Sequence, residues 1–144
     1  MKFLSLFVVL SLLMVFSKTA SAQQHPFKGM WVEIYKDSTE EKLLKRCREF
    51  DEGIYKGVLF VNDTSTEYLM ANKIFWGNIK KMQRLRGTNF EIVDLSYGSG
   101  RVTDEPTYHN DARELWSISE DKKTLVKVHL KAEEAYISRW HLCS

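Results

Sequence analysis

The sequence lacks the short motifs that identify common classes of hydrolase, metalloenzyme and nucleotide-binding protein. No histidine pair has the H-E-x-x-H spacing of a zinc site, no serine lies in a nucleophile motif, and Gly98-Ser99-Gly100 is too short to hold a phosphate. His129 and His141 lie in runs that we expect to be neighbouring strands, so a metal site assembled by the fold is the alternative to ordinary histidines. Because no acid, base and nucleophile set can be named, we expect a protein that is not an enzyme and has no metal or cofactor.

The sequence also has no apolar run long enough to cross a membrane comfortably. Residues 3–16 are apolar apart from two serines, follow Met1-Lys2, and precede the small residues Ala20-Ser21-Ala22. This order is typical of a secretory signal, whereas an uncleaved anchor would need an apolar core of roughly twenty residues. We expect residues 1–22 to be removed near Ala22-Gln23 and residues 23–144 to form one exported domain, secreted or periplasmic.

No surplus of charge remains once the signal is set aside. Lys2 and Lys18 leave with it, so that Lys and Arg fall from 21 to 19 and equal the 19 Asp and Glu. A neutral chain gives no reason to expect a nucleic-acid partner. The one basic cluster is either a solvated face or a site for an anionic ligand; its members are Lys80, Lys81, Arg84 and Arg86.

Cysteine is scarce as well, since Cys47 and Cys143 are the only two. An exported chain can keep a disulfide between them, and the alternative is two separate buried thiols. Cys47 lies in the one stretch with helical spacing, which begins with the capping-box pattern at residues 38–41 and ends before Gly53. A bridge would therefore attach this helix to the C-terminal strand.

The rest of the chain reads as short runs of β-branched and aromatic residues separated by polar turns. We expect eight strands, at residues 29–36, 54–61, 66–75, 79–86, 89–97, 112–119, 124–131 and 136–143. Several carry large apolar side chains on both faces; for example, Val58 and Phe60 oppose Leu59 and Val61. An all-β antiparallel barrel of about eight strands with one short helix after the first strand accounts for this pattern, and a sandwich is the structural rival.

The long polar loop at residues 101–111 is rich in oxygen ligands. It lacks the spaced ligands of a recognised calcium loop, so a solvated loop is the simpler interpretation.

Gly29-Met30-Trp31 opens the first strand soon after the signal, and Ser138-Arg139-Trp140-His141 lies in the last. Together with about eight strands, these motifs resemble the lipocalin-like (calycin) family, and most of all its small exported bacterial domains of unknown function. In that family the tryptophan of the first strand closes one end of the barrel, and a basic residue of the last strand packs across it. The resemblance implies that Gly29, Trp31 and Arg139 close the barrel and that Arg139 stacks on Trp31.

The leading functional hypothesis is a binding protein that holds a small apolar or amphipathic molecule inside the barrel. If the face of Trp31 points inward, Glu33 and Tyr35 also point inward and are the candidate ligand-binding residues. The alternative is a protein-interaction or inhibitor module with a filled barrel, in which the basic cluster and the 101–111 loop are the working parts.

Overall fold

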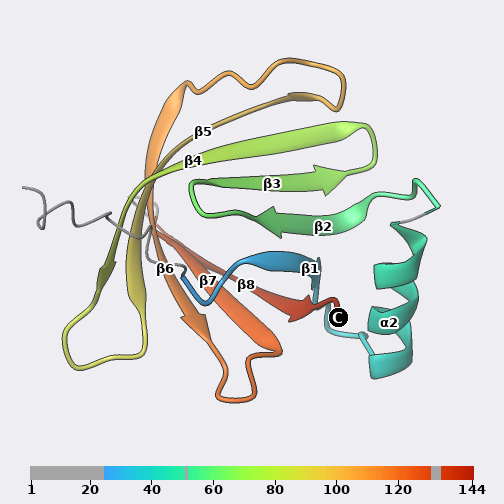
Figure 1. The fold of residues 1–144 in the computed structure, drawn as a ribbon, viewed down its shortest axis with the longest axis horizontal. Coiled ribbons are helices and arrows are strands. Elements are labelled where there is room, and N and C mark those ends of the chain that lie inside the picture. Colours follow the sequence, from blue (N-terminus) through green and yellow to red (C-terminus); the bar gives the residue numbers. More distant parts are fainter. Residues whose placement is uncertain (1–24, 51, 131–133) are drawn as a thin grey trace, which may run out of the picture.

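Eight strands form a closed antiparallel barrel in the computed structural model, which describes residues 25–50, 52–130 and 134–144. Each strand pairs with the next, and the last returns to the first, with Trp31 opposite Leu142 (Figure 1). The elements are β1 (Gly29–Glu33), α2 (Glu40–Glu49), β2 (Lys56–Val61), β3 (Ser65–Met70), β4 (Lys73–Arg84), β5 (Glu91–Arg101), β6 (Asn110–Ile118), β7 (Thr124–Leu130) and β8 (Ala135–Leu142). The all-β class, the barrel and the helix after the first strand are thus confirmed. The expected signal at residues 1–22 lies outside the described residues.

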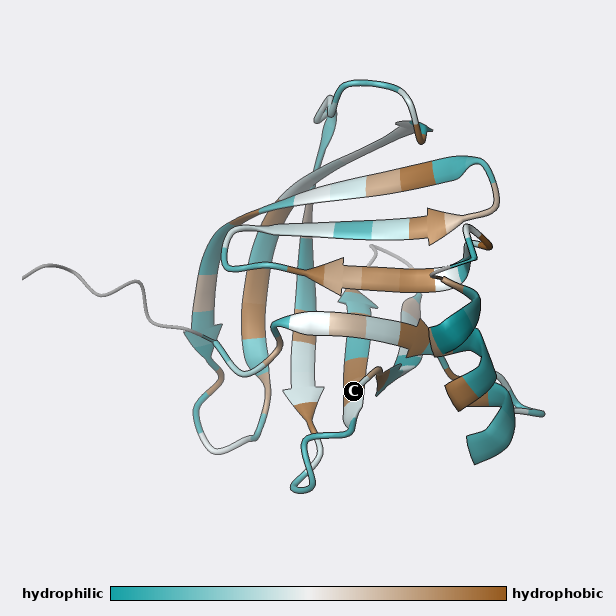
Figure 2. Cartoon of the chain, turned by 45° about the vertical axis from the view of Figure 1, so that its right-hand side comes forward, coloured by the Kyte–Doolittle hydropathy of each residue, from teal (hydrophilic) through white to brown (hydrophobic). Residues whose placement is uncertain are grey.

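Apolar residues on both faces of β1 and β2 have two different environments. The inward face contributes to the barrel core, while the outward side chains of Val32 and Val58 pack with Leu43 of helix α2. The helix therefore covers a patch on the outside of the barrel, beside β1 and β2 (Figure 1). The hydropathy colouring is consistent with this packing, since β2 is apolar over most of its length and α2 is largely polar (Figure 2).

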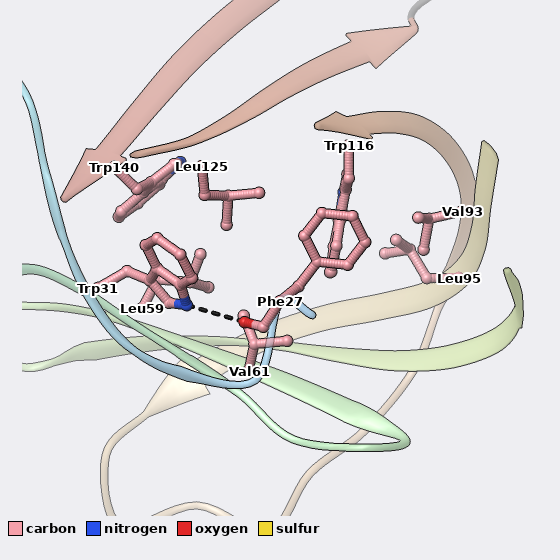
Figure 3. Packing of buried hydrophobic residues seen from close by; sticks show 9 residues of the cluster. All are labelled: Phe27, Trp31, Leu59, Val61, Val93, Leu95, Trp116, Leu125 and Trp140. Atoms are coloured by element: carbon pink, nitrogen blue, oxygen red, sulfur yellow. Dashed lines mark hydrogen bonds between the residues drawn. The ribbon is translucent and has the colours of Figure 1, made fainter. Parts of the chain in front are cut away.

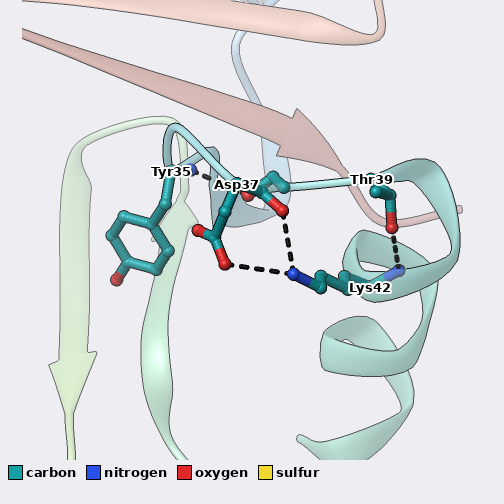
Figure 4. A network of polar contacts seen from close by, with 5 residues as sticks. Tyr35, Asp37, Thr39 and Lys42 are labelled. Carbon is teal, nitrogen blue, oxygen red and sulfur yellow. Dashed lines mark hydrogen bonds and ion pairs between the residues drawn. The ribbon is translucent and has the colours of Figure 1, made fainter.

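Helix α2 begins one residue later than the capping-box pattern of Ser38 and Glu41 predicts. Thr39 is the N-cap, and its hydroxyl accepts the backbone N–H of Lys42 at 3.3 Å. The Lys42 ammonium also contacts the Asp37 carboxylate and carbonyl, each at 3.0 Å, which ties the first turn to the preceding loop (Figure 4). At its other end the helix is fixed by a disulfide between Cys47 and Cys143, whose Cα atoms are 5.6 Å apart.

The expected bounds of the third and fourth strands are wrong. The chain turns at Ala71 and Asn72, with Ala71 at φ 55°, whereas the expected turn near Gly77 lies in the middle of the long strand β4. Gly77 marks a close approach instead, because a Cβ there would lie 2.3 Å from the Thr66 hydroxyl on β3. Gly98 has a similar role in β5, which continues to Arg101 past the glycines that we expected to end it.

The core fills one end of the barrel. Trp31, Trp116 and Trp140 pack there with Phe27, which precedes β1 and meets the Trp116 ring edge-on at 5.5 Å. The indole N–H of Trp31 donates to the carbonyl of Phe27 at 2.9 Å (Figure 3). Around these rings lie the aliphatic members of the cluster, Leu59, Val61, Val93, Leu95 and Leu125. Large aromatic side chains thus close this end of the barrel.

Candidate ligand-binding cavity

The other end of the barrel is hollow, with a cavity of about 640 Å³. The inward positions of the strands pass from the packed end into this cavity. Along β5, Val93 lies in the core, Leu95 lies at its edge and Tyr97 lines the cavity; β7 similarly passes from Leu125 to Lys127 and His129. The volume lies within the range of small-molecule sites in proteins, roughly 300–1,000 Å³.

Aromatic and aliphatic side chains surround the mouth of the cavity. Phe75, Tyr97, Leu130 and Tyr136 line it while remaining 39%, 37%, 43% and 57% exposed. They come from four strands, β4, β5, β7 and β8. Several exposed apolar side chains at one opening are typical of an entrance for an apolar molecule.

Further inside, the cavity wall carries a buried polar network centred on Glu114 of β6. One carboxylate oxygen lies 2.5 Å from Nδ1 of His129. The other oxygen lies 3.2 Å from Nζ of Lys127 and accepts the indole N–H of Trp116 at 2.6 Å. Burial by itself would raise the pKa of Glu114, but the Lys127 ammonium and the hydrogen bonds from His129 and Trp116 hold that pKa at about 2. Glu114 is therefore a carboxylate at neutral pH.

The same network continues to Ser138 on β8. Nε2 of His129 lies 3.4 Å from the Ser138 hydroxyl, which also accepts the indole N–H of Trp140 at 2.9 Å. The order Ser138, His129, Glu114 is the order of a hydrolase triad. Sequence reasoning missed this arrangement, although acidic, basic and hydroxyl residues at the inward positions of β6, β7 and β8 are its signal.

Glu33, at the end of β1, lines the cavity as the sequence predicts. One of its carboxylate oxygens accepts two phenolic hydroxyls, from Tyr35 at 3.0 Å and from Tyr68 at 3.2 Å. Burial, followed by the charge of Glu33, raises the pKa of Tyr68, so this phenol is a hydrogen-bond donor over the whole physiological range. Tyr68 was not identified from the sequence.

The expectation that Tyr35 points into the cavity is wrong. Tyr35 lies beyond the end of β1, is 43% exposed, and is not among the residues that line the cavity. Its backbone N–H donates to the Ser38 hydroxyl at 2.8 Å, so the alternation of the strand has already ended. The guanidinium of Arg46 lies over its ring, 4.8 Å from the centroid. Tyr35 reaches the cavity only through its bond to Glu33.

The expected stacking of Arg139 on Trp31 is also wrong. Ser138 and Trp140 point into the barrel, so Arg139 between them points out and is exposed, whereas Trp31 is fully buried. The basic side chain that lies over a tryptophan is Lys127, with Nζ 4.9 Å from the centre of the Trp116 ring. Gly29 lies at the start of β1, opposite Val61.

The basic cluster, with Lys80, Lys81 and Arg84 in β4 and Arg86 just after it, is partly neutralised and lies outside the cavity. Lys80 is paired with Asp111 at 2.7 Å and Arg84 with Glu91 at 3.1 Å, so two of the four charges are neutralised. The hydrogen bond from Lys80 lowers the pKa of Asp111. None of the four basic side chains lines the cavity. The sequence alone could not show this, because the pairing carboxylates lie on other strands.

Among the described residues, no three His, Cys, Asp or Glu side chains are grouped as ligands of a metal ion would be. Asp111, from the oxygen-rich loop, instead accepts hydrogen bonds from Lys80 and Ser96. Nor does this part of the chain contain a helix with the length and apolar character needed to span a bilayer.

Comparison with known proteins gives no relative from which a function could be transferred. No protein-family model matches the chain, and no match was found among curated proteins or among solved structures.

Proposed function

We propose that the chain is an exported, lipocalin-like binding protein that holds one small amphipathic molecule in the hollow end of its barrel. The observation that carries this proposal is the cavity of about 640 Å³ with exposed apolar side chains at its mouth. Its wall combines aromatic surface with a few polar groups, as expected for a ligand with an apolar body and a hydrogen-bonding head.

The test is binding of an environment-sensitive apolar dye to the folded protein, followed by displacement with fatty acids and other amphiphiles. Tyr136→Ala removes a ring from the mouth and should weaken dye binding several-fold. Ile137→Ala is the matched control, because Ile137 is similarly exposed but does not line the cavity. Equal effects of the two substitutions would place the dye elsewhere. If the folded protein binds neither dye nor amphiphile, the binding function fails and the protein-interaction module becomes the better hypothesis.

The order Ser138, His129, Glu114 favours one second candidate, the hydrolysis of an ester held in the cavity. Ser138 Oγ would form a bond to the acyl carbon and pass its proton to His129, the alcohol would leave with that proton, and water would then release the acyl group. Ser138 is only 5% exposed, and its hydroxyl already accepts the Trp140 indole, which favours a structural role. The test is turnover of p-nitrophenyl esters. Loss of this turnover in both Ser138→Ala and His129→Ala would establish the enzyme. If the wild-type protein is no more active than the two variants, the enzyme is excluded.

A further inference from the structure

Among the described residues, the charged side chains that line the cavity are paired with one exception. Glu114 is paired with Lys127 and His129. Asp111 is paired with Lys80, and Arg113 with Asp94 at 2.6 Å, so these two wall charges are neutralised by residues outside the cavity.

Glu33 is the exception. Its contacts are the hydroxyls of Tyr35 and Tyr68, and across the described ranges it forms no ion pair with a basic side chain. Both hydroxyls bind the same oxygen, and none of the described residues donates a hydrogen bond to the other. A carboxylate in a partly desolvated cavity is stabilised most by a partner of opposite charge.

Arg46, a basic side chain close to Glu33, has other partners. Its guanidinium donates to the backbone carbonyls of Glu33, Lys56 and Gly57, and it lies over the Tyr35 ring. These hydrogen bonds go to backbone carbonyls and not to the Glu33 carboxylate. Arg46 therefore fixes the end of β1, and thereby the position of Glu33, without forming an ion pair with the Glu33 side chain.

The surroundings of Glu33 are aromatic. Trp140 lies opposite Glu33 in the β1–β8 register, and the Tyr68 ring that bonds Glu33 meets Trp140 edge-on at 5.3 Å. Tyr68 also stacks on Phe75 at 5.6 Å. All three rings line the cavity. A carboxylate beside several aromatic rings is a suitable environment for an organic cation, since ring faces attract cations and the carboxylate supplies the opposite charge.

We propose that the cavity selects a cationic amphiphile, an apolar molecule with a protonated or quaternary ammonium head, and that Glu33 is its counter-ion. This inference rests on the proposed binding function and names the chemistry of the ligand. The apolar body occupies the space between Leu95 and the mouth, while the head lies against Glu33, Tyr68 and Trp140. The ammonium replaces water at the carboxylate oxygen that no phenol occupies.

The test compares three probes of the same chain length, octylamine, octanol and octanoate, by displacement of the apolar dye at neutral pH. The wild-type protein should bind the amine about tenfold more tightly than the alcohol, with octanoate the weakest, and the preference should shrink as salt is raised. This comparison needs no variant, so it does not depend on whether a substitution folds.

The variant Glu33→Gln keeps an acceptor for the two phenols and should bring the affinity for octylamine down to that for octanol. Glu67→Gln is the matched control, since it removes the same charge from β3 at a position that does not line the cavity. If all three probes bind equally, or if the amine preference survives Glu33→Gln, the inference fails while the binding function stands. If neither the dye nor any of the three probes binds, the inference and the proposed binding function both fail.

Discussion

Inside the barrel, the carboxylate of Glu114 and the ammonium of Lys127 lie 3.2 Å apart with both side chains less than one-tenth exposed. Taking two charges out of water is costly, and only their mutual attraction and further hydrogen bonds offset that cost. Here the remaining partners of Glu114 are His129 and Trp116. The pair lies between the packed core and the cavity, so its integrity affects both stability and the shape of the site.

The first prediction concerns acid. The pKa of Glu114 is about 2 in the folded protein against an ordinary value of 4.5, so its contribution to stability is complete above pH 4.5 and is lost as pH falls toward 2. By linkage this contribution is on the order of 3 kcal/mol. Urea unfolding at intervals from pH 6 to pH 2.5 measures it. Glu114→Gln should lose that part of the pH dependence; an identical profile in both proteins would contradict the assignment.

The second prediction concerns the loss of one partner. Lys127→Met leaves the Glu114 carboxylate buried without its ammonium and should lower the free energy of unfolding by about 3–5 kcal/mol. The double variant Glu114→Gln with Lys127→Met should cost clearly less than the sum of the two single changes. Lys80→Met is the control, because the Lys80–Asp111 pair is exposed and its loss should cost no more than about 1 kcal/mol. Denaturant titration of the four variants and the wild type provides the measurement.

The sequence predicted the elements that depend on local patterns. Eight runs of β-forming residues and one capped helix are visible without tertiary information, and closure of the barrel follows from the need to remove free edges. The turn at Ala71 and Asn72 was missed because Gly77 is the better turn residue by composition. What Gly77 accommodates is the Thr66 side chain of the neighbouring strand, a contact that exists only after pairing.

The site was less predictable, for a physical reason. Alternation along β1 correctly places Glu33 in the cavity, but it fails for Tyr35 because the strand ends before it. Glu114, Lys127 and Ser138 have residue types that usually face solvent. Only the register of three adjacent strands, in which Glu114 lies opposite His129 and Lys127 lies opposite Ser138, shows that they form one interior network.

The third prediction concerns the disulfide. Cys47 and Cys143 are separated by 96 residues, so on the chain-entropy model the bridge stabilises the fold by roughly 4–5 kcal/mol, less any strain. Mass spectrometry after alkylation without reduction should find no free thiol in the folded protein. The double substitution Cys47→Ser with Cys143→Ser should lower the denaturation midpoint, with helix α2 the first element to lose protection from hydrogen exchange. Two alkylated cysteines in the native protein would show that packing alone holds the helix.

The last prediction separates the roles of Trp31 and Arg139. Arg139 points outward and is exposed, so Arg139→Ala should change the free energy of unfolding by no more than about 0.5 kcal/mol. Trp31→Phe keeps an aromatic ring at the packed end but removes the indole N–H that donates to the Phe27 carbonyl. The unpaired buried carbonyl and the smaller ring should together cost on the order of 2–4 kcal/mol. A large effect of Arg139→Ala, with strong coupling to Trp31→Phe in a double-mutant cycle, would restore the stacked pair that the lipocalin resemblance implies.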